Sequence, residues 1–158
     1  MTPPAQREFQ LLARVRRSLR SLNNAIGRGA VGAGLTLQQQ GFLLALKAYG
    51  GHDVQFADVR EELEMDRATA SILLRRLIAM KLVSRTTASD RRAVRISLTA
   101  RGQSAFADSV KLIGGEIRAA DHRQELGALR QDLDRYLRFY LPPSEAGPPR
   151  KAPPRRKD

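Results

Sequence analysis

Apolar residues recur along most of this chain at intervals of three and four, which is the spacing of one face of an α-helix. The pattern predicts six helices, over residues 7–28, 35–49, 54–63, 67–80, from 99 past 115, and 121–141. Between the fourth and fifth helices, residues 83–87 and 93–98 are two candidate strands. In the second, Val94, Ile96 and Leu98 alternate with Arg95 and Ser97, as in a half-buried strand. The sequence therefore predicts a mainly α fold with a small β-wing.

Local signals place several of the boundaries. The glycine-rich stretch 27–34 is expected to end the first helix, and Gly50-Gly51 the second. Thr36 and Gln39 fit a capping box, and Asp66 is a good N-cap for the helix that follows it. Gly114-Gly115 falls inside the fifth helix, which predicts a kink or a close approach to another backbone.

The helix over 67–80 is apolar on one face and carries small and basic side chains on the other. A short helix, a turn and this second helix make a helix-turn-helix. The exposed face of this second helix has small side chains near its start, where base edges would approach. Further along it has basic side chains, where phosphates would lie. The predicted DNA-contacting residues of this helix are Arg67, Ala68, Thr69, Ser71, Ile72, Arg75 and Arg76.

Ile72 is the apolar member of that face. An isoleucine there would contact a thymine methyl group in the major groove. The alternative is a single exposed apolar residue with no function, as most proteins have.

The two predicted strands flank the sequence ASDRR, whose serine and aspartate favour a turn. A basic hairpin tip beside a helix-turn-helix is a wing, and the negative potential of a narrow minor groove attracts arginine. Arg91 or Arg92 is the predicted minor-groove contact, with Asp90 holding an arginine in position.

The first and last predicted helices carry narrow apolar seams, which suggests a homodimer built from both. Packing within one chain is the alternative. The predicted dimerisation residues are Leu12, Val15, Leu19, Leu129, Leu133, Tyr136 and Tyr140.

With 158 residues the chain suits one domain with a real core. We expect four segments: an N-terminal helix and turn (1–34), a winged helix-turn-helix (35–102), C-terminal dimerisation helices (103–141) and a disordered basic tail (142–158). No apolar run approaches the roughly 20 residues that cross a bilayer. We therefore expect a cytoplasmic protein with no membrane partner.

The net charge of +12 points to a polyanionic partner, and its distribution favours double-stranded DNA. Residues 66–102 hold nine Lys or Arg and two Asp, hence +7 of the total. There is no cysteine, which excludes disulfides and thiolate nucleophiles, and only two histidines. We expect no metal site, no cofactor and no enzymatic activity.

The order of predicted elements, together with Asp90-Arg91-Arg92 and the later Leu98-Thr99-Ala100-Arg101-Gly102, resembles the MarR family of bacterial transcription regulators. The resemblance covers about residues 7 to 141. It implies a homodimer on a pseudo-palindromic operator, usually a repressor, which a small and often aromatic or anionic effector releases from DNA.

Glu64 and Lys81 stand where the MarR family commonly has glycine. If their left-handed backbone is kept, each costs on the order of 1 kcal/mol.

Two other functions remain open. One is a chromosomal protein that binds DNA of any sequence, driven by the overall charge and the basic tail. The other is an interaction module whose winged helix binds protein.

Overall fold

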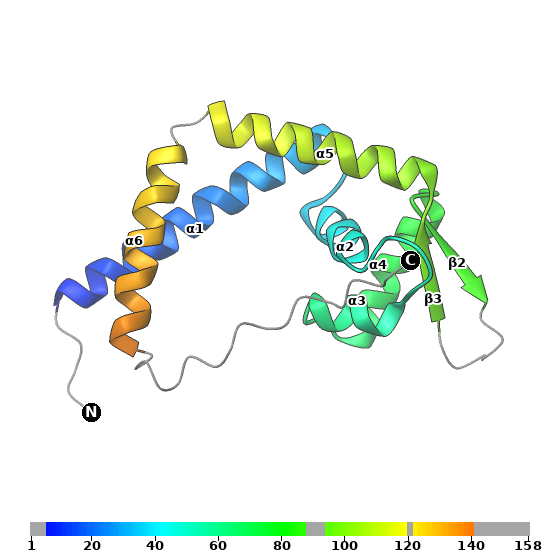
Figure 1. The fold of residues 1–158 in the computed structure, drawn as a ribbon, viewed down its shortest axis with the longest axis horizontal. Coiled ribbons are helices and arrows are strands. Elements are labelled where there is room, and N and C mark those ends of the chain that lie inside the picture. Colours follow the sequence, from blue (N-terminus) through cyan, green and yellow to red (C-terminus); the bar gives the residue numbers. More distant parts are fainter. Residues whose placement is uncertain (1–5, 88–93, 120–121, 141–158) are drawn as a thin grey trace. The chain divides into compact units, whose positions relative to one another are not determined.

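The computed structural model describes residues 6–87, 94–119 and 122–140 and confirms a mainly α fold with a small antiparallel sheet (Figure 1). In chain order the elements are α1 (Gln6–Gly32), α2 (Leu37–Ala48), β1 (Val54–Gln55), α3 (Phe56–Glu62), α4 (Arg67–Ala79), β2 (Val83–Thr87), β3 (Val94–Leu98), α5 (Ala100–Ala119) and α6 (His122–Tyr140).

Contacts between residues divide the chain into two units. The terminal unit comprises Met1–Ile26 and Gly114–Asp158, and the winged-helix unit comprises Gly27–Ile113. Both α1 and α5 contribute residues to each unit.

The winged-helix unit contains the larger core, in which α2, α3 and α4 pack with a three-stranded sheet. The strand order is β1-β3-β2, and both pairings are antiparallel. The register sets Val83 opposite Leu98 and Val54 opposite Ile96, so the apolar side chains of all three strands face the core. The largest fully buried apolar side chains are Phe42, Leu43, Leu46, Val59, Leu77, Val83 and Ile96.

The expected end of the first helix is wrong, because α1 continues through the glycine-rich stretch to Gly32. The reason is packing within the winged-helix unit. A Cβ added to Gly29 would lie 2.6 Å from the N, Cα and Cγ1 atoms of Ile113 on α5. Ala30 is fully buried in the core. These small residues allow the end of α1 to lie directly against α5, and that burial outweighs the low helix propensity of glycine.

The third predicted helix begins two residues too early. Val54 and Gln55 form β1, paired with Ile96 and Arg95 of β3, and the helix begins at Phe56. Two residues give no detectable alternation of their own. Their partner strand lies some forty residues later, so local periodicity could not reveal the pairing.

The predicted capping box of α2 is confirmed. The backbone N–H of Gln39 donates to Thr36 Oγ1 (3.2 Å), and the backbone N–H of Thr36 donates to Gln39 Oε1 (2.8 Å). The α2 helix then ends before Gly50 and Gly51, whose φ angles of 97° and 78° lie in the left-handed region.

Asp66 is the N-cap of α4, as predicted. Its Oδ1 atom accepts hydrogen bonds from the backbone N–H groups of Ala68 and Thr69, both at 2.9 Å. Hydrogen bonding from Thr69, and to a smaller extent from Ala68, lowers the pKa of the Asp66 carboxyl because it stabilises the charged form.

The close approach expected at Gly114-Gly115 is found elsewhere. A Cβ at Gly115 would meet no atom within 4 Å, and the three atoms nearest to one at Gly114 belong to the guanidinium group of Arg118 on the same helix. The close contact of α5 is instead made one residue earlier, where Ile113 lies against Gly29.

In the terminal unit, α1 and α6 are joined by a bidentate ion pair. The Nε and Nη2 atoms of Arg14 donate to the two carboxylate oxygens of Asp132 at 3.0 and 3.1 Å. This pairing lowers the pKa of Asp132. Val15 and Leu129 are buried, whereas the large apolar side chains of Phe9, Leu19 and Leu137 are exposed.

The glycine contact gives a matched pair of substitutions in α1. Gly29→Ala is expected to lower the free energy of unfolding by about 1–3 kcal/mol, because the new Cβ meets the backbone of Ile113. Gly27→Ala on the same helix meets nothing within 4 Å and is expected to raise it by about 0.5–1 kcal/mol through helix propensity. Urea denaturation measures both. Equal effects of the two variants would contradict the close contact.

The Asp66 cap predicts a pH-dependent stability. A carboxyl with a lowered pKa stabilises the fold above its ordinary value, about 3.9, and this contribution is lost as the pH falls through the lowered value. Asp66→Ala is expected to lower the melting temperature at pH 7. Asp66→Asn caps about as well as aspartate and is expected to preserve it.

As the pH falls below 4, the parent protein should lose stability relative to Asp66→Asn, which cannot titrate. Thermal melts from pH 7 to pH 3 measure this difference. A constant difference across that range would show that the cap charge contributes nothing.

Candidate nucleic-acid interface

The α4 helix packs one face into the core and presents the other to solvent. Ala70, Leu73, Leu74 and Leu77 are buried, as the apolar pattern predicted. Among the predicted contact residues of α4, only Ser71 is half-buried; its hydroxyl donates to the Arg67 carbonyl at 2.7 Å. The other six are exposed, namely Arg67, Ala68, Thr69, Ile72, Arg75 and Arg76. The structure thus brings the predicted residues of α4 together on one surface.

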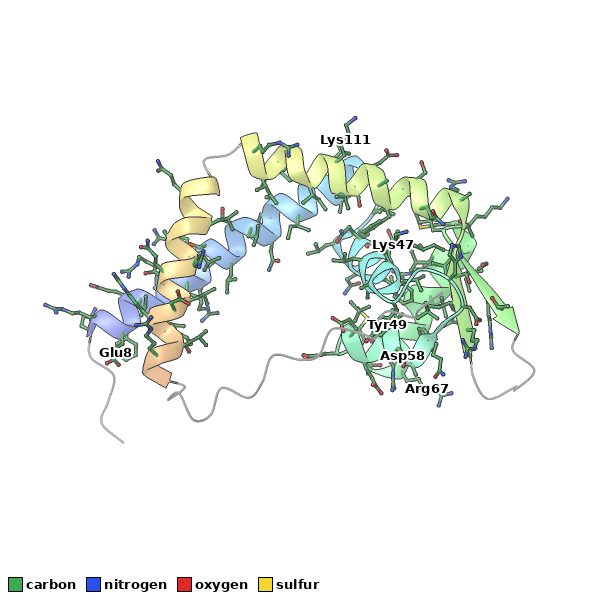
Figure 2. All side chains as sticks on the ribbon, viewed as in Figure 1. Glu8, Lys47, Tyr49, Asp58, Arg67 and Lys111 are labelled. Atoms are coloured by element: carbon green, nitrogen blue, oxygen red, sulfur yellow. The ribbon has the colours of Figure 1, made fainter. Side chains whose placement is uncertain are left out.

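The character of this surface changes along the helix. Ala68 and Thr69 make the first turn narrow, and Arg75 and Arg76 provide two cations in the last turns. Figure 2 shows Arg67 projecting away from the start of α4. Ile72 lies between these groups and is 44% exposed, so the core does not need its side chain.

Two left-handed residues bracket the helix. Glu64 in the preceding turn has φ 50°, and Lys81 after the helix has φ 60°. Both keep the conformation that glycine adopts without strain, so each position carries the expected cost on the order of 1 kcal/mol. The positions of both turns are therefore maintained by the surrounding fold rather than by local preference.

The base of the predicted wing is formed by β2 and β3, paired from Val83–Leu98 to Thr87–Val94. Asp90, Arg91 and Arg92, the predicted tip residues, lie outside the described residues.

Two arginines on the wing strands were not singled out from sequence. Arg85 on β2 is exposed. Arg95 on β3 is only half-exposed, and its Nη1 donates to the backbone carbonyl of Asp53 (2.7 Å) and to its Oδ2 (2.9 Å). The alternation of the second predicted strand marked Arg95 as outward-facing, whereas Arg85 is in register with the buried Ile96 and had no such signal. Only the structure shows that Arg95 is neutralised by a residue 42 positions away.

The Thr99 side chain ties the end of α4 to the wing and to α5. Its hydroxyl donates to the carbonyl of Lys81 at 2.6 Å and accepts from the backbone N–H of Gly102 at 3.0 Å. The backbone N–H of Thr99 donates to the Leu82 carbonyl at 3.1 Å. A Cβ on Gly102 would collide with that same carbonyl, so only glycine allows this approach.

The winged-helix unit is also electrostatically polarised. The α3 helix carries three carboxylates, Asp58, Glu61 and Glu62, and one cation, Arg60, which pairs with Glu61 at 3.8 Å. The α4 helix, in contrast, carries arginines and no acidic residue. Burial, and then the negative charges of Glu62 and Asp58, raise the pKa of the Tyr49 phenol. An acidic α3 surface repels phosphates, which favours α4 as the surface that faces a polyanion.

The part of the chain that the structure describes contains no cluster of three or more His, Asp or Glu side chains arranged to hold a metal ion. None of its helices combines the length and hydropathy needed to cross a bilayer.

Residues 33–93 match the family model described as the MarR family, which confirms the resemblance inferred from the wing motif. No curated protein matches the chain. The match is to a family of transcription regulators, in agreement with the expectation that the chain is not an enzyme.

Solved structures show the same fold. A crystal structure of a MarR family transcription regulator is 22% identical, with a TM-score of 0.69, covering 88% of this chain and 93% of that one. A mutant MarR from E. coli complexed with operator DNA is 19% identical, with a TM-score of 0.64, covering 84% and 94%.

BpsR from Bordetella bronchiseptica, whose DNA binding is regulated by 6-hydroxynicotinic acid, is 24% identical, with a TM-score of 0.62, covering 83% and 98%. Residues 33–93 of this chain therefore match the MarR family model, and the chain has the winged helix-turn-helix fold of solved MarR family structures.

Proposed function

We propose that this protein is a homodimeric, sequence-specific DNA-binding transcriptional regulator, and that it acts as a repressor released from its operator by a small molecule. The observation that carries the proposal is the exposed face of α4. Its side chains are small at the start of the helix, basic at the end, and do not pack into the core. The similarity to MarR in complex with operator DNA supports the same use of the helix.

In this proposal α4 lies in the major groove. The short side chains of Ala68 and Thr69 allow the start of the helix to approach base edges, with Arg67 and Ser71 beside them. Arg75 and Arg76 contact phosphates or guanine. Ile72 contacts a thymine methyl, and the exposed state of its side chain in the free protein leaves it available for that contact.

The wing provides a second point of attachment. Arg91 or Arg92 enters the minor groove, and Asp90 orients an arginine at the tip. Arg85, exposed on β2, adds a phosphate contact near the base of the wing. Arg95 is left out of this set because Asp53 already neutralises it.

Dimerisation uses the apolar seams of the terminal helices. In the single chain the seam residues Val15 and Leu129 are buried, whereas Leu19 is exposed, as are nearby Phe9 and Leu137. Covering these three side chains gives an apolar driving force for association. Two-fold symmetry then presents two α4 helices to half-sites about 10 base pairs apart, on a pseudo-palindromic operator.

The remaining parts of the proposal are regulatory. BpsR responds to 6-hydroxynicotinic acid, and we propose that a small aromatic or anionic effector likewise lowers the operator affinity of this protein. The functional segments are a dimerisation helix in 1–34, a DNA-binding core in 35–102, dimerisation helices in 103–141 and a basic tail in 142–158. A regulator that acts on the chromosome of a bacterium works in the cytoplasm.

The DNA contacts are tested by Arg76→Ala and Arg92→Ala. Each is expected to weaken operator binding by about tenfold to a hundredfold, as for the loss of a bidentate base contact or a strong phosphate contact. Melting temperatures should stay within about 1 °C, because Arg76 is exposed and Arg92 is proposed to contact only DNA, and surface substitutions contribute little stability. Fluorescence anisotropy with operator DNA measures the affinity. Arg95→Ala is the matched control, and it is expected to change affinity far less because Asp53 holds its charge.

The operator itself is found by footprinting the purified protein across genomic DNA. Discrete protected palindromes support a sequence-specific regulator. Uniform coverage with a steep salt dependence would instead support the sequence-indifferent chromosomal protein. The absence of DNA affinity at moderate salt would support the third hypothesis, an interaction module whose winged helix binds protein.

The dimer is tested by Leu19→Glu, which adds a charge to an exposed apolar side chain of the proposed interface. We expect the parent to sediment as a dimer and Leu19→Glu as a monomer, because burying an unpaired carboxylate is strongly unfavourable. Leu44→Glu on α2 places the same charge at another exposed leucine and is expected to leave the dimer intact. Analytical ultracentrifugation distinguishes these states. Equal dissociation by both variants would rule out the proposed seam.

A further inference from the structure

The guanidinium group of Arg95, on the wing strand β3, is bound by Asp53 in the loop before β1. Its Nη1 atom donates to the backbone carbonyl of Asp53 at 2.7 Å and to the Oδ2 atom of the same residue at 2.9 Å. The side chain of Arg95 is 25% exposed, whereas that of Asp53 is 58% exposed. The arginine is therefore the more covered member of the pair, and the carboxylate is the more accessible one.

The backbone of Asp53 is arranged for this contact. Its φ angle of 49° lies in the left-handed region, which aspartate tolerates better than most residues other than glycine. The N–H of Asp53 donates to Ser97 Oγ at 2.9 Å, and the carbonyl of Gly51 accepts from the N–H of Leu98 at 2.7 Å. Two hydrogen bonds to β3 thus fix a strained loop whose carbonyl and carboxylate meet the same guanidinium group.

Arg95 lies at the level of the wing where a phosphate contact is already proposed. In the β2–β3 pairing, Arg95 is opposite Thr86, and Arg85 is opposite Ile96. Successive side chains of a strand point to opposite faces, so the two arginines extend from opposite faces of the sheet. A wing whose tip enters a minor groove has a phosphate backbone on each side. A free cation on either face is therefore placed to contact phosphate.

The carboxylate of Asp53 neutralises this cation. The residues paired with Arg95 across the sheet are Gln55 and Thr86, and both are uncharged. The charge of the Asp53–Arg95 pair is zero with the carboxylate in place and would be +1 without it. One carboxylate thus decides whether this part of the wing attracts phosphate.

We propose that Asp53 limits the sequence-independent DNA affinity of the wing by withholding Arg95 from phosphate, an inference that rests on the proposed DNA-binding function. A phosphate contact adds affinity on every sequence, because the backbone carries no sequence information. A regulator with more such contacts is retained more strongly by non-operator DNA, which is present in large excess. Loss of the Asp53 carboxylate therefore strengthens DNA binding.

The test compares Asp53→Asn with the parent by fluorescence anisotropy on two labelled duplexes of equal length, the operator and a scrambled sequence. Asparagine is similar in size and tolerates the left-handed backbone, but it has no charge. We expect Asp53→Asn to bind both duplexes about twofold to fivefold more tightly, the range of an exposed ion pair. The slope of log K against log salt concentration should steepen by about 0.9, as for one added phosphate contact.

Further variants show whether the gain comes from the released arginine. Arg95→Gln alone should bind close to the parent, and Asp53→Asn combined with Arg95→Gln should lose most of the gain. Asp53→Gly also removes the carboxylate and adopts the left-handed backbone, so it should reproduce the gain. Glu61→Gln is the matched control on α3, because it removes the same charge and releases Arg60, which pairs with Glu61 at 3.8 Å. It should bind DNA close to the parent, since α3 is outside the proposed contacts.

Three results would overturn the inference. These are parent-like binding by both Asp53→Asn and Asp53→Gly, an equal gain from Glu61→Gln, and a gain that persists in the double variant. A parent that binds DNA without any gain in the Asp53 variants refutes this inference alone. A parent that binds neither duplex refutes the proposed function as well, so the two failures are distinguished.

Discussion

The hydrogen bonds of Thr99 are the constraint on which the rest of the winged-helix unit depends. One hydroxyl and one backbone N–H connect the turn after α4, the start of β2 and the first turn of α5. Gly102 allows this arrangement because its missing side chain leaves room for the Leu82 carbonyl. Since Leu82 and Leu98 are also buried in the core, the polar junction is anchored by apolar packing on the adjacent residues.

This junction explains how a strained turn can be kept beside the proposed reading helix. The left-handed Lys81 provides the carbonyl that Thr99 binds, so its unfavourable φ angle is held by a hydrogen bond of 2.6 Å and by the burial of Leu82. At the other end of α4, the Asp66 cap fixes the first turn. The helix is therefore held at both ends and along its buried face, and the exposed face is free of any structural duty.

The parts of the fold that follow from short-range signals could be predicted from sequence. The capping box at Thr36, the cap at Asp66 and the outward face of α4 each depend on residues within one or two helical turns. The features that could not be predicted depend on distant partners. Gly29 reads as a helix breaker until Ile113 is placed against it, and Val54 belongs to a strand only because Ile96 lies opposite. Arg85 and Arg95 are both arginines on the wing strands, yet the ion pair with Asp53 neutralises Arg95 and makes it unavailable for DNA.

The ion pair between Arg95 and Asp53 shows why net charge alone is a poor measure of DNA recognition. Arginines bound by carboxylates, such as Arg14 and Arg95, add to the total of +12 but make little contribution to phosphate binding. Phosphate contacts provide affinity without sequence information, whereas contacts with base edges discriminate between sequences. The exposed face of α4 holds few groups of the second kind. Ile72 is the one whose apolar surface is neither buried in the core nor useful to a phosphate. The proposed base recognition therefore accounts for an isoleucine that neither folding nor charge explains.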